Sequence, residues 1–429
     1  MTDKQLAAQA DAAFRATTIT YQEWQRRLQQ GKYPDPSKTK WWQGFDALGQ
    51  IGATPPPPVD PPPTQTGPVT ISKGGTYVLN AVGDTSHPAV SISTTEPVVI
   101  KDSVLTNPSR AKPGVKAQPV IDCSYLAVDL TVTNTRFNGG DGRAVDCENQ
   151  KRLVVTNCSF EQTAGIVAQA GPAGGVISIL RNAFHNIRDN GYLLNKPDGG
   201  GSPGNAVQLR SVVLPATEIA WNQVLNEYAG TMAQYQAGSG CWPEDLINLW
   251  QTSNTHIHNN YFQHHSTPGN GAEEAAGRQE QSSQGTITVD SGSSHNLVEF
   301  NQMVSTIYGV VFAAGTSDNL AQFNRLVSAG YLSDGVTKQY YGFGGYMISG
   351  GNNNHMHSNV SGWVSGTKYG YGRSDFWFDN GGMTNPTHTQ AQENALNTLL
   401  PDPITRQTEL DEWQAWLAKL DANNVKVGA

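Results

Sequence analysis

A ten-residue segment that occurs twice constrains the fold more than any other feature. The segment NLVEFNQMVS at 296–305 is followed 23 positions later by NLAQFNRLVS at 319–328, and six of the ten letters are identical. Both copies belong to a series in which a short apolar strand, a polar turn, a second apolar strand and an asparagine recur. Such repetition is typical of solenoid proteins, in which each copy buries its neighbour.

The spacing within each repeat is nearly constant. From the first strand to the asparagine the gap is 12 to 16 residues, whereas the gap to the next first strand varies from 9 to 27. The anchoring positions are Asn134, Asn157, Asn182, Asn222, Asn260, Asn301, Asn324 and Asn359, with Asp102 as an earlier member. The first strands are expected to begin near Val90, Ile121, Val145, Ile166, Val207, Ile247, Ile287, Val311 and Met347.

Side chains before the asparagine alternate between apolar and polar, as Val298 and Glu299 do. This is the inward and outward alternation of a strand. Asparagine tolerates the left-handed conformation of a sharp corner, and stacked copies can bond from coil to coil. The sequence therefore predicts an all-β fold: a right-handed, single-stranded parallel β-helix of about nine coils, with short helical segments near both termini.

Composition excludes several classes of partner. The net charge is -8 and no cluster of Lys and Arg is visible, which argues against binding to nucleic acid. No apolar run approaches the ~20 residues of a membrane span and the start has no signal pattern, so we expect synthesis in the cytoplasm and no membrane insertion. The four cysteines form no CxxC pair, which favours buried free thiols, and no cofactor is expected.

Composition also divides the chain into four parts. Residues 1–53 are expected to form a helical attachment module, although its aromatic residues would also suit a small local core. Residues 54–67 are a proline-rich linker, and 68–382 form the β-helix. Residues 383–429 are a C-terminal extension. Its helix either caps the open end of the stack, which is the default expectation, or docks on another subunit.

The long insertions all follow the asparagine strand, so they are expected to emerge along one edge of the stack and to form the walls of a groove. They are rich in aromatic residues, whose faces suit the C–H faces of sugar rings. An alternative is that these side chains only pack the loops against one another. The predicted ligand-binding residues are Tyr228, Tyr235, Trp242, Tyr340, Tyr341, Tyr346 and Trp377.

Catalytic residues are harder to assign. Hydrolysis of a glycosidic bond needs two carboxyl groups, one of them kept protonated. The acidic residues that can meet from adjoining loops and strands include Asp189 and Asp290, and the catalytic candidates are Glu244, Asp245 and Glu227.

Two further groups of side chains invite a metal interpretation. Asp122 and Asp146 occupy matching strand positions and could share a Ca²⁺, or else be solvated near Lys151 or Arg152. The histidines His256, His258, His264 and His265 lie close in sequence, but the spacing marks no third ligand, so solvent-facing histidines are the preferred interpretation.

The segment LAAQADAAFRATTITYQEWQRRLQQGKYPDPSKTKWWQGFDALGQI, which covers most of the first 53 residues, resembles through Tyr21, Trp24, Trp41 and Trp42 the N-terminal module of minor tail proteins of phages that infect mycobacteria and related actinobacteria. The remainder resembles phage tailspikes and pectate-lyase-like proteins only as a generic parallel β-helix. The resemblance implies a virion component at the tail tip, attached to other tail proteins through residues 1–53, and trimeric rods are common among resembling proteins. It supplies no catalytic motif, and a shared fold does not establish a shared activity.

Three hypotheses follow. The first is a structural tail protein that contacts host-surface glycan without cleaving it. The second is a depolymerase, either a glycoside hydrolase or a polysaccharide lyase, that acts on host envelope polysaccharide. The third is an architectural spacer whose loops contact only neighbouring tail proteins.

Overall fold

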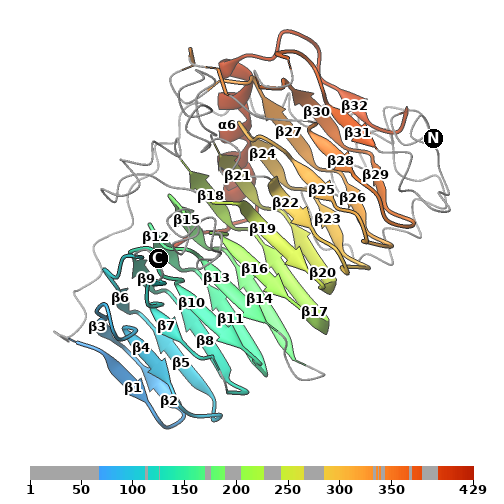
Figure 1. The fold of residues 1–429 in the computed structure, drawn as a ribbon. Coiled ribbons are helices and arrows are strands. Elements are labelled where there is room, and N and C mark those ends of the chain that lie inside the picture. The colour runs from blue at the N-terminus through green and yellow to red at the C-terminus, as the bar shows by residue number, and fades with distance from the viewer. Residues whose placement is uncertain are drawn as a thin grey trace.

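The computed structural model describes residues 67–111, 115–124, 126–169, 175–188, 204–226, 243–264, 285–331, 335–336, 338–339, 344–366, 370–378 and 395–429. The predicted N-terminal module, all but the last residue of the proline-rich linker, and residues 383–394 lie outside these ranges. Within them the chain forms an elongated stack of short parallel strands, with one α-helix along its side (Figure 1).

Each coil contributes strands to three parallel sheets, which we call A, B and C. Sheet A contains β1 (Val69–Ile71), β4 (Val90–Ile92), β7 (Ile121–Asp122), β10 (Val145–Glu148), β13 (Ile166–Gln169), β16 (Val207–Arg210), β19 (Asp245–Trp250), β22 (Gly285–Val289), β25 (Val310–Phe312), β28 (Tyr346–Ile348) and β31 (Phe376–Phe378). Sheet B contains β2 (Gly75–Tyr77), β5 (Val98–Lys101), β8 (Asp129–Thr133), β11 (Arg152–Thr156), β14 (Val176–Leu180), β17 (Val213–Ala220), β20 (Ser253–His258), β23 (Leu297–Glu299), β26 (Leu320–Gln322) and β29 (His355–His357). Sheet C contains β3 (Asn80–Val82), β6 (Val104–Thr106), β9 (Arg136–Asn138), β12 (Ser159–Glu161), β15 (Ala183–His185), β18 (Gln223–Asn226), β21 (Tyr261–His264), β24 (Gln302–Val304), β27 (Arg325–Ser328), β30 (Val360–Trp363) and β32 (Thr398–Leu399).

This arrangement is a parallel β-helix, as the repeat predicts. All nine predicted first strands lie in sheet A, from β4 to β28, and β1 and β31 extend that sheet to eleven strands. The stretches that follow the repeated asparagines form sheet C. The spacing of the repeat alone does not show that these stretches are strands separate from the second strand of each repeat. At ~4.8 Å per rung, eleven rungs give a stack about 50 Å long.

A ladder of asparagines joins the coils at the corner between sheets B and C. Asn301 Nδ2 donates to Asn324 Oδ1 (2.9 Å) and to the backbone oxygen of Ile257 (3.0 Å). The two repeated asparagines therefore lie on adjacent rungs, as predicted. The ladder members are Asn182, Asn222, Asn260, Asn301, Asn324, Asn359 and Asn397.

The corner differs from the prediction in one respect. The left-handed residue is the one before each ladder asparagine except Asn397, at Arg181, Trp221, Asn259, Phe300, Phe323 and Ser358. Asn134 (φ 48°) and Asn157 (φ 53°) occupy this left-handed position, with Asp102 (φ 49°) before them. These three predicted anchors are therefore one residue ahead of the ladder and form a separate stack, in which Asn134 Nδ2 donates to Asp102 Oδ1 (2.6 Å).

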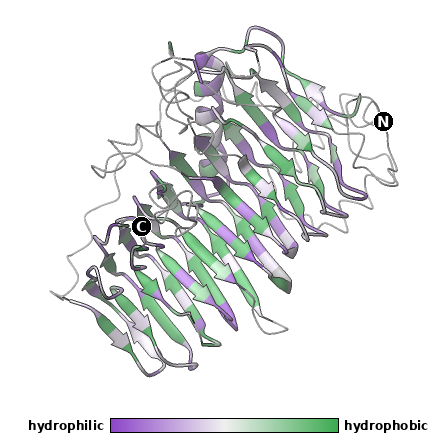
Figure 2. Ribbon diagram, viewed as in Figure 1, coloured by the Kyte–Doolittle hydropathy of each residue, from purple (hydrophilic) through white to green (hydrophobic). Residues whose placement is uncertain are grey.

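The core is a column of side chains from the inward rows of the three sheets. It is mostly aliphatic, in keeping with the apolar strands drawn in green in Figure 2. One aromatic stack runs through its N-terminal half, where Phe160 lies between Phe137 (4.6 Å between ring centroids) and Phe184 (4.5 Å). Cys123, Cys147 and Cys158 are buried free thiols, as predicted for these three cysteines.

The predicted C-terminal helix is α6 (Arg406–Ala422), which begins with a capping box formed by Thr405 and Thr408. It lies along sheet C beside β24 and β27, so it covers a flank of the stack rather than its open end (Figure 1). The predicted apolar face packs there: Trp416 is fully buried against Tyr261, with Trp413, Leu417 and Leu420 around them.

The same helix also buries charged groups against sheet C. Glu412 bonds to Arg325, Glu409 accepts from the backbone nitrogen of Ala329 (2.8 Å), and Lys419 donates to the backbone oxygen of Phe300 (3.0 Å). Burial lowers the pKa of Lys419 to about 7. The helix is thus fixed to the later coils by polar contacts as well as by its tryptophans.

Candidate functional site

The long connections leave the stack on one edge, as predicted. Five of them in the later coils follow strands of sheet C and precede strands of sheet A, namely β15 to β16, β18 to β19, β21 to β22, β27 to β28 and β30 to β31, whereas the connection from β31 to β32 runs from sheet A to sheet C. A side chain at the start of a sheet A strand therefore lies where a long connection ends. Glu244 and Asp245, at the start of β19, are in this position.

Asp245 forms the centre of a buried polar cluster. It is 2% exposed and accepts hydrogen bonds from Thr288 Oγ1 (2.7 Å) and from Asn248 Nδ2 (2.9 Å). Asn248 Nδ2 also donates to Asp290 Oδ2 (2.7 Å), and Gln208 donates to the Asn248 oxygen (3.2 Å). Asn248 therefore bridges two carboxyl groups, which come from successive rungs of sheet A.

Both carboxyl groups are shifted toward the protonated form. Burial, followed by the charges of Glu244 and Asp290, raises the pKa of Asp245 well above its usual range. Burial also raises the pKa of Asp290. Because both bond the same nitrogen, the two carboxyl oxygens lie within ~6 Å of each other, a separation at which one carboxyl can stay protonated beside the other.

An exposed tryptophan lies beside this cluster. Trp250, at the end of β19, is 43% exposed and pairs in register with Arg210 of β16. Asp290 follows β22, the neighbouring strand on the other side. The outer surface of sheet A thus combines a flat aromatic face, a guanidinium and a carboxyl group. The sequence reasoning named Asp290 but missed Trp250, whose signal was its position on the outward row of a predicted strand.

The predicted aromatic residues are only partly within the described residues. Tyr346 is fully buried: it stacks on Phe376 (5.5 Å between ring centroids) and its hydroxyl donates to the backbone oxygen of Val360 (3.3 Å). It belongs to the core and cannot stack on a surface ligand. Trp377 is 41% exposed on β31, the last strand of sheet A. The remaining candidates lie outside the described residues: Tyr228, Tyr235, Trp242, Tyr340, Tyr341 and the carboxylate candidate Glu227.

Asp122 and Asp146 are neighbours across β7 and β10, as their matching positions predict. Each already has a protein partner: Arg143 Nη1 donates to both oxygens of Asp146 (2.7 and 2.9 Å), and Ser124 Oγ donates to Asp122 (2.7 Å). Arg143, rather than Lys151 or Arg152, supplies the cation. No group of three metal-ligating side chains occurs in the part of the chain that the structure describes.

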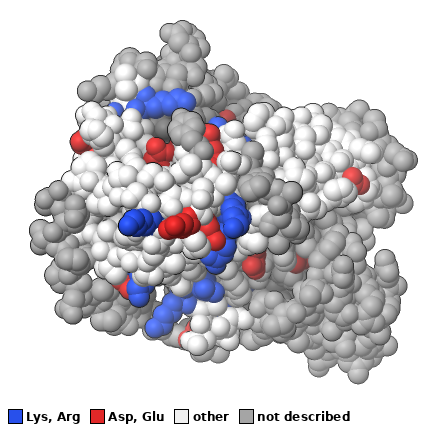
Figure 3. Space-filling model, turned by 90° about the horizontal axis from the view of Figure 1, so that it is seen from below, with Lys and Arg blue, Asp and Glu red and all other residues white. Residues whose placement is uncertain are grey.

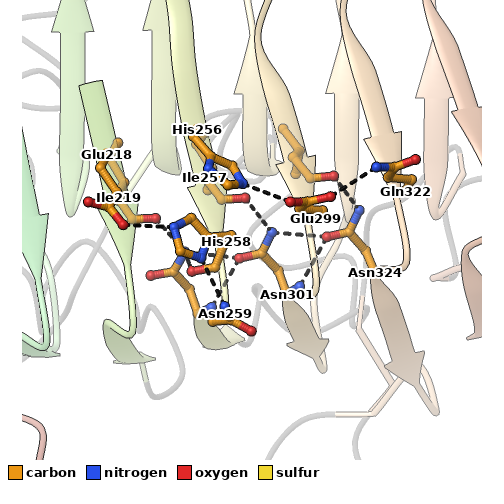
Figure 4. A network of polar contacts seen from close by, with 12 residues as sticks. Glu218, Ile219, His256, Ile257, His258, Asn259, Glu299, Asn301, Gln322 and Asn324 are labelled. Carbon is orange, nitrogen blue, oxygen red and sulfur yellow. Dashed lines mark hydrogen bonds and ion pairs between the residues drawn. The ribbon is translucent and has the colours of Figure 1, made fainter. Parts of the chain in front are cut away.

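The histidines form a network on the outer face of sheet B (Figure 4). His256 Nε2 bonds to Glu299 (2.9 Å), whose other oxygen accepts from Gln322 (2.9 Å). His258 Nε2 bonds to Glu218 (2.9 Å), and the two imidazole rings stack 4.0 Å apart. His264 lies on β21 of sheet C, and His265 is outside the described residues, so the four histidines do not form one site.

Hydrogen bonds and burial together determine the protonation of His258. Asn259 Nδ2 bonds to His258 Nδ1 (2.9 Å), so Nδ1 is the acceptor and Nε2 carries the proton toward Glu218. Burial lowers the pKa of His258, and the hydrogen bond from His258 lowers the pKa of Glu218. The pair is therefore a neutral imidazole that donates to a carboxylate.

Among the described residues no helix is long and apolar enough to cross a bilayer. On the face drawn in Figure 3, basic side chains lie among acidic ones near the middle, and a few acidic side chains lie apart from them. No family model and no curated protein matches the sequence, and no solved structure matches the fold.

Proposed function

We propose that this chain is a structural component of a phage tail tip, which presents the outer face of its later coils to host-surface glycan. Residues 1–53, whose sequence resembles a tail-protein module, would attach it to other tail proteins within the virion. A stack of parallel strands suits this role because each coil is held by the coils on both sides. The stack therefore presents its outer faces in a fixed arrangement.

The observation that carries the proposal is the position of Trp250 on sheet A. Its exposed ring offers an apolar face for the C–H face of a sugar, and Arg210 beside it offers hydrogen-bond donors for hydroxyl groups. The Asp245, Asn248 and Asp290 cluster fixes the neighbouring backbone and side chains. A rigid, preorganised surface loses less conformational entropy when it binds.

Titration of the full chain with host envelope polysaccharide tests this proposal. Trp250→Ala is expected to weaken binding by about tenfold or more, because aromatic anchors dominate many binding surfaces. Trp377→Ala is the matched comparison, since it removes an equally exposed tryptophan from the last strand of the same sheet. Absence of any binding by the parent chain, or equal binding by parent and Trp250→Ala, would contradict the proposal.

A second candidate function is a glycoside hydrolase, and the carboxyl pair favours it. Glycosidases place two carboxyl groups across the scissile bond, and a separation of roughly 5–5.5 Å suits a retaining enzyme. Asp290, which is only partly buried and has a raised pKa, would be the general acid. Glu244 or Asp245 would supply the partner carboxylate, although Asp245 as it stands is nearly inaccessible.

A reducing-end assay on envelope polysaccharide separates the two candidates. Hydrolysis predicts release of fragments by the parent chain and a loss of at least ~100-fold in Asp290→Asn. Glu244→Gln and Asp245→Asn then identify the partner carboxylate. A parent chain that binds polysaccharide but releases no fragments supports recognition without cleavage.

A further inference from the structure

A second polar site lies on sheet B, on a different face from Trp250. A groove of about 360 Å³ crosses three successive coils and is lined by Asn254, Thr255, His256, His295, Asn296, Leu297 and Asp318. None of these residues belongs to the carboxyl cluster of sheet A. The groove is about the size of one or two sugar rings, and it adjoins the histidine network of Figure 4.

His256 is held in place from behind. Its Nε2 bonds to Glu299, which is 4% exposed, and Glu299 is in turn bonded by the fully buried Gln322. In the neutral imidazole, Nε2 donates its proton to the Glu299 carboxylate, so Nδ1 keeps its lone pair. His256 therefore presents a fixed hydrogen-bond acceptor at the groove, oriented by a partner that the groove does not expose.

The rim of the groove comes from left-handed corner residues on three rungs. Asn254 (φ 61°), His295 (φ 56°) and Asp318 (φ 56°) are the equivalent residues of successive coils. His295 Nε2 is 4.0 Å from Asp318 Oδ2, and the other Asp318 oxygen accepts from Asn353 Nδ2 (2.7 Å). The rim thus carries an amide, an imidazole and a carboxylate, one from each rung.

The remaining lining is apolar or buried. Leu297 is 7% exposed and contributes an apolar surface between His256 and the corner residues. Asn296 is already fixed in a second asparagine ladder, in which its Nδ2 donates to Asn319 Oδ1 (3.0 Å). Planar polar groups around a small apolar surface complement a molecule with hydroxyl edges and a C–H face.

We propose that this groove binds a neutral saccharide of one or two rings. The carboxylates of Asp318 and Glu299 disfavour an anionic ligand, and the described residues hold no set of three metal ligands. The ligand class follows from the groove itself, whereas its source in the cell envelope rests on the proposed function. In the bound state one ligand hydroxyl donates to His256 Nδ1, and two other ligand hydroxyls donate to the carboxylate of Asp318.

The test measures binding of four neutral disaccharides to the full chain: maltose, cellobiose, lactose and diacetylchitobiose. Saturation-transfer NMR detects the binding, and titration calorimetry gives the affinity. Binding of at least one disaccharide is expected. Asp318→Gly and His256→Ala are each expected to weaken it about tenfold, because each removes a hydrogen bond. Glycine at 318 retains the left-handed backbone without strain, so the variant should fold. Ser358→Gly makes the same change at a left-handed corner outside the groove and should bind like the parent.

The outcomes separate this site from the site on sheet A. Trp250→Ala should bind the disaccharide like the parent, even if it no longer binds polysaccharide. Failure of all four disaccharides to bind would overturn the groove proposal and leave the Trp250 surface standing. Unchanged binding by folded Asp318→Gly and His256→Ala, or loss of binding in Trp250→Ala alone, would also overturn it.

Discussion

The early coils, from β1 to β12, and the later coils, from β16 to β30, follow the same backbone path with different side chains at one corner. In the early coils the ladder position holds Ser103, Thr135 or Cys158, and the Thr135 hydroxyl donates only to Thr133 of its own coil (3.0 Å). In the later coils every such position is an asparagine, whose amide both donates and accepts. The later coils are therefore joined by one continuous ladder of identical amides, whereas the early coils have only separate bonds between rungs at this corner, such as Asn134 Nδ2 to Asp102 Oδ1 and Leu79 N to Ser103 Oγ.

The outer faces differ in the same way. On sheet B the early coils carry partly exposed Thr131 and Val154, whereas later coils carry the buried Glu299 and Gln322 and the histidines bonded to this network. The fold requires only that the inward rows be apolar. The comparison teaches that the outward rows are free to vary, and that in this chain the later coils carry a buried polar network there.

The largest expected effect is on the aromatic core of the early coils. Phe160→Ala removes the middle ring of the stack and leaves a cavity, which should lower the free energy of unfolding by about 3–5 kcal/mol. Urea unfolding followed by circular dichroism measures it. Val154→Ala, on the outward row of the same coil, should cost about 1 kcal/mol or less. Equal losses of unfolding free energy in the two variants would mean that the aromatic stack does not stabilise these coils.

The next effect concerns the ladder. Asn301→Ala removes the acceptor of the Asn260 backbone nitrogen (3.1 Å) and one of the acceptors of the Asn260 side-chain nitrogen (2.9 Å), since both donate to Asn301 Oδ1. We expect a loss of about 2–3 kcal/mol in the free energy of unfolding, against about 1 kcal/mol for Thr135→Val in the early coils. The same urea experiment compares them. A larger loss for Thr135→Val would reverse the comparison.

A smaller effect, of opposite sign, is expected at the helix. Burial lowers the pKa of Lys419 from 10.5 to about 7, so the unfolded chain binds this proton more strongly. This group therefore makes stability rise as the pH increases from about 7 toward 10. Lys419→Met should be more stable than the parent at pH 7, on the order of 1–2 kcal/mol, with a flatter pH profile. Thermal unfolding between pH 7 and pH 10 tests this, and a variant with the slope of the parent would contradict it.

The smallest effect is expected at His258. Burial lowers its pKa below the ordinary histidine value of about 6.5, so protonation favours the unfolded chain. Its contribution to stability should be lost as the pH falls below about 6.5. His258→Gln should reduce this acid sensitivity by less than about 1 kcal/mol, measured by unfolding between pH 7 and pH 5. Identical dependence of stability on pH in parent and variant would show that His258 does not contribute to the acid sensitivity.

The sequence predicted the architecture because the inward rows repeat in register. Two kinds of error occurred, namely an offset of one residue at the corner and the assignment of a core tyrosine to the surface. Asn134 and Asn157 are one position from the ladder, and both positions favour asparagine, one for its backbone and the other for its amide. Tyr346 was assigned to the surface because it lies among other tyrosines, yet it pairs with Val310, which is on an inward row. Alternation along β28 was the signal that would have placed it in the core.

The candidate sites were less predictable, because they depend on contacts between distant residues. Asp245 and Asp290 meet through Asn248, and Glu412 of α6 meets Arg325 of β27, which is 87 residues away. A helical pattern shows which apolar residues share a face, but it cannot show that Glu412 and Lys419 have partners on a sheet. Trp250 was missed because aromatic residues were sought in insertions rather than on strands.

The most direct test of the central claim, that the later coils contact glycan, is hydroxyl-radical footprinting of the full chain with and without host envelope polysaccharide. Trp250 is exposed in the free protein, so its oxidation rate is measurable. The account predicts that polysaccharide slows oxidation of Trp250 several-fold. Oxidation of Tyr371, an exposed tyrosine whose hydroxyl donates to the backbone oxygen of Ala329, should be unchanged. Binding of polysaccharide without protection of Trp250 or of the His256 groove would contradict it.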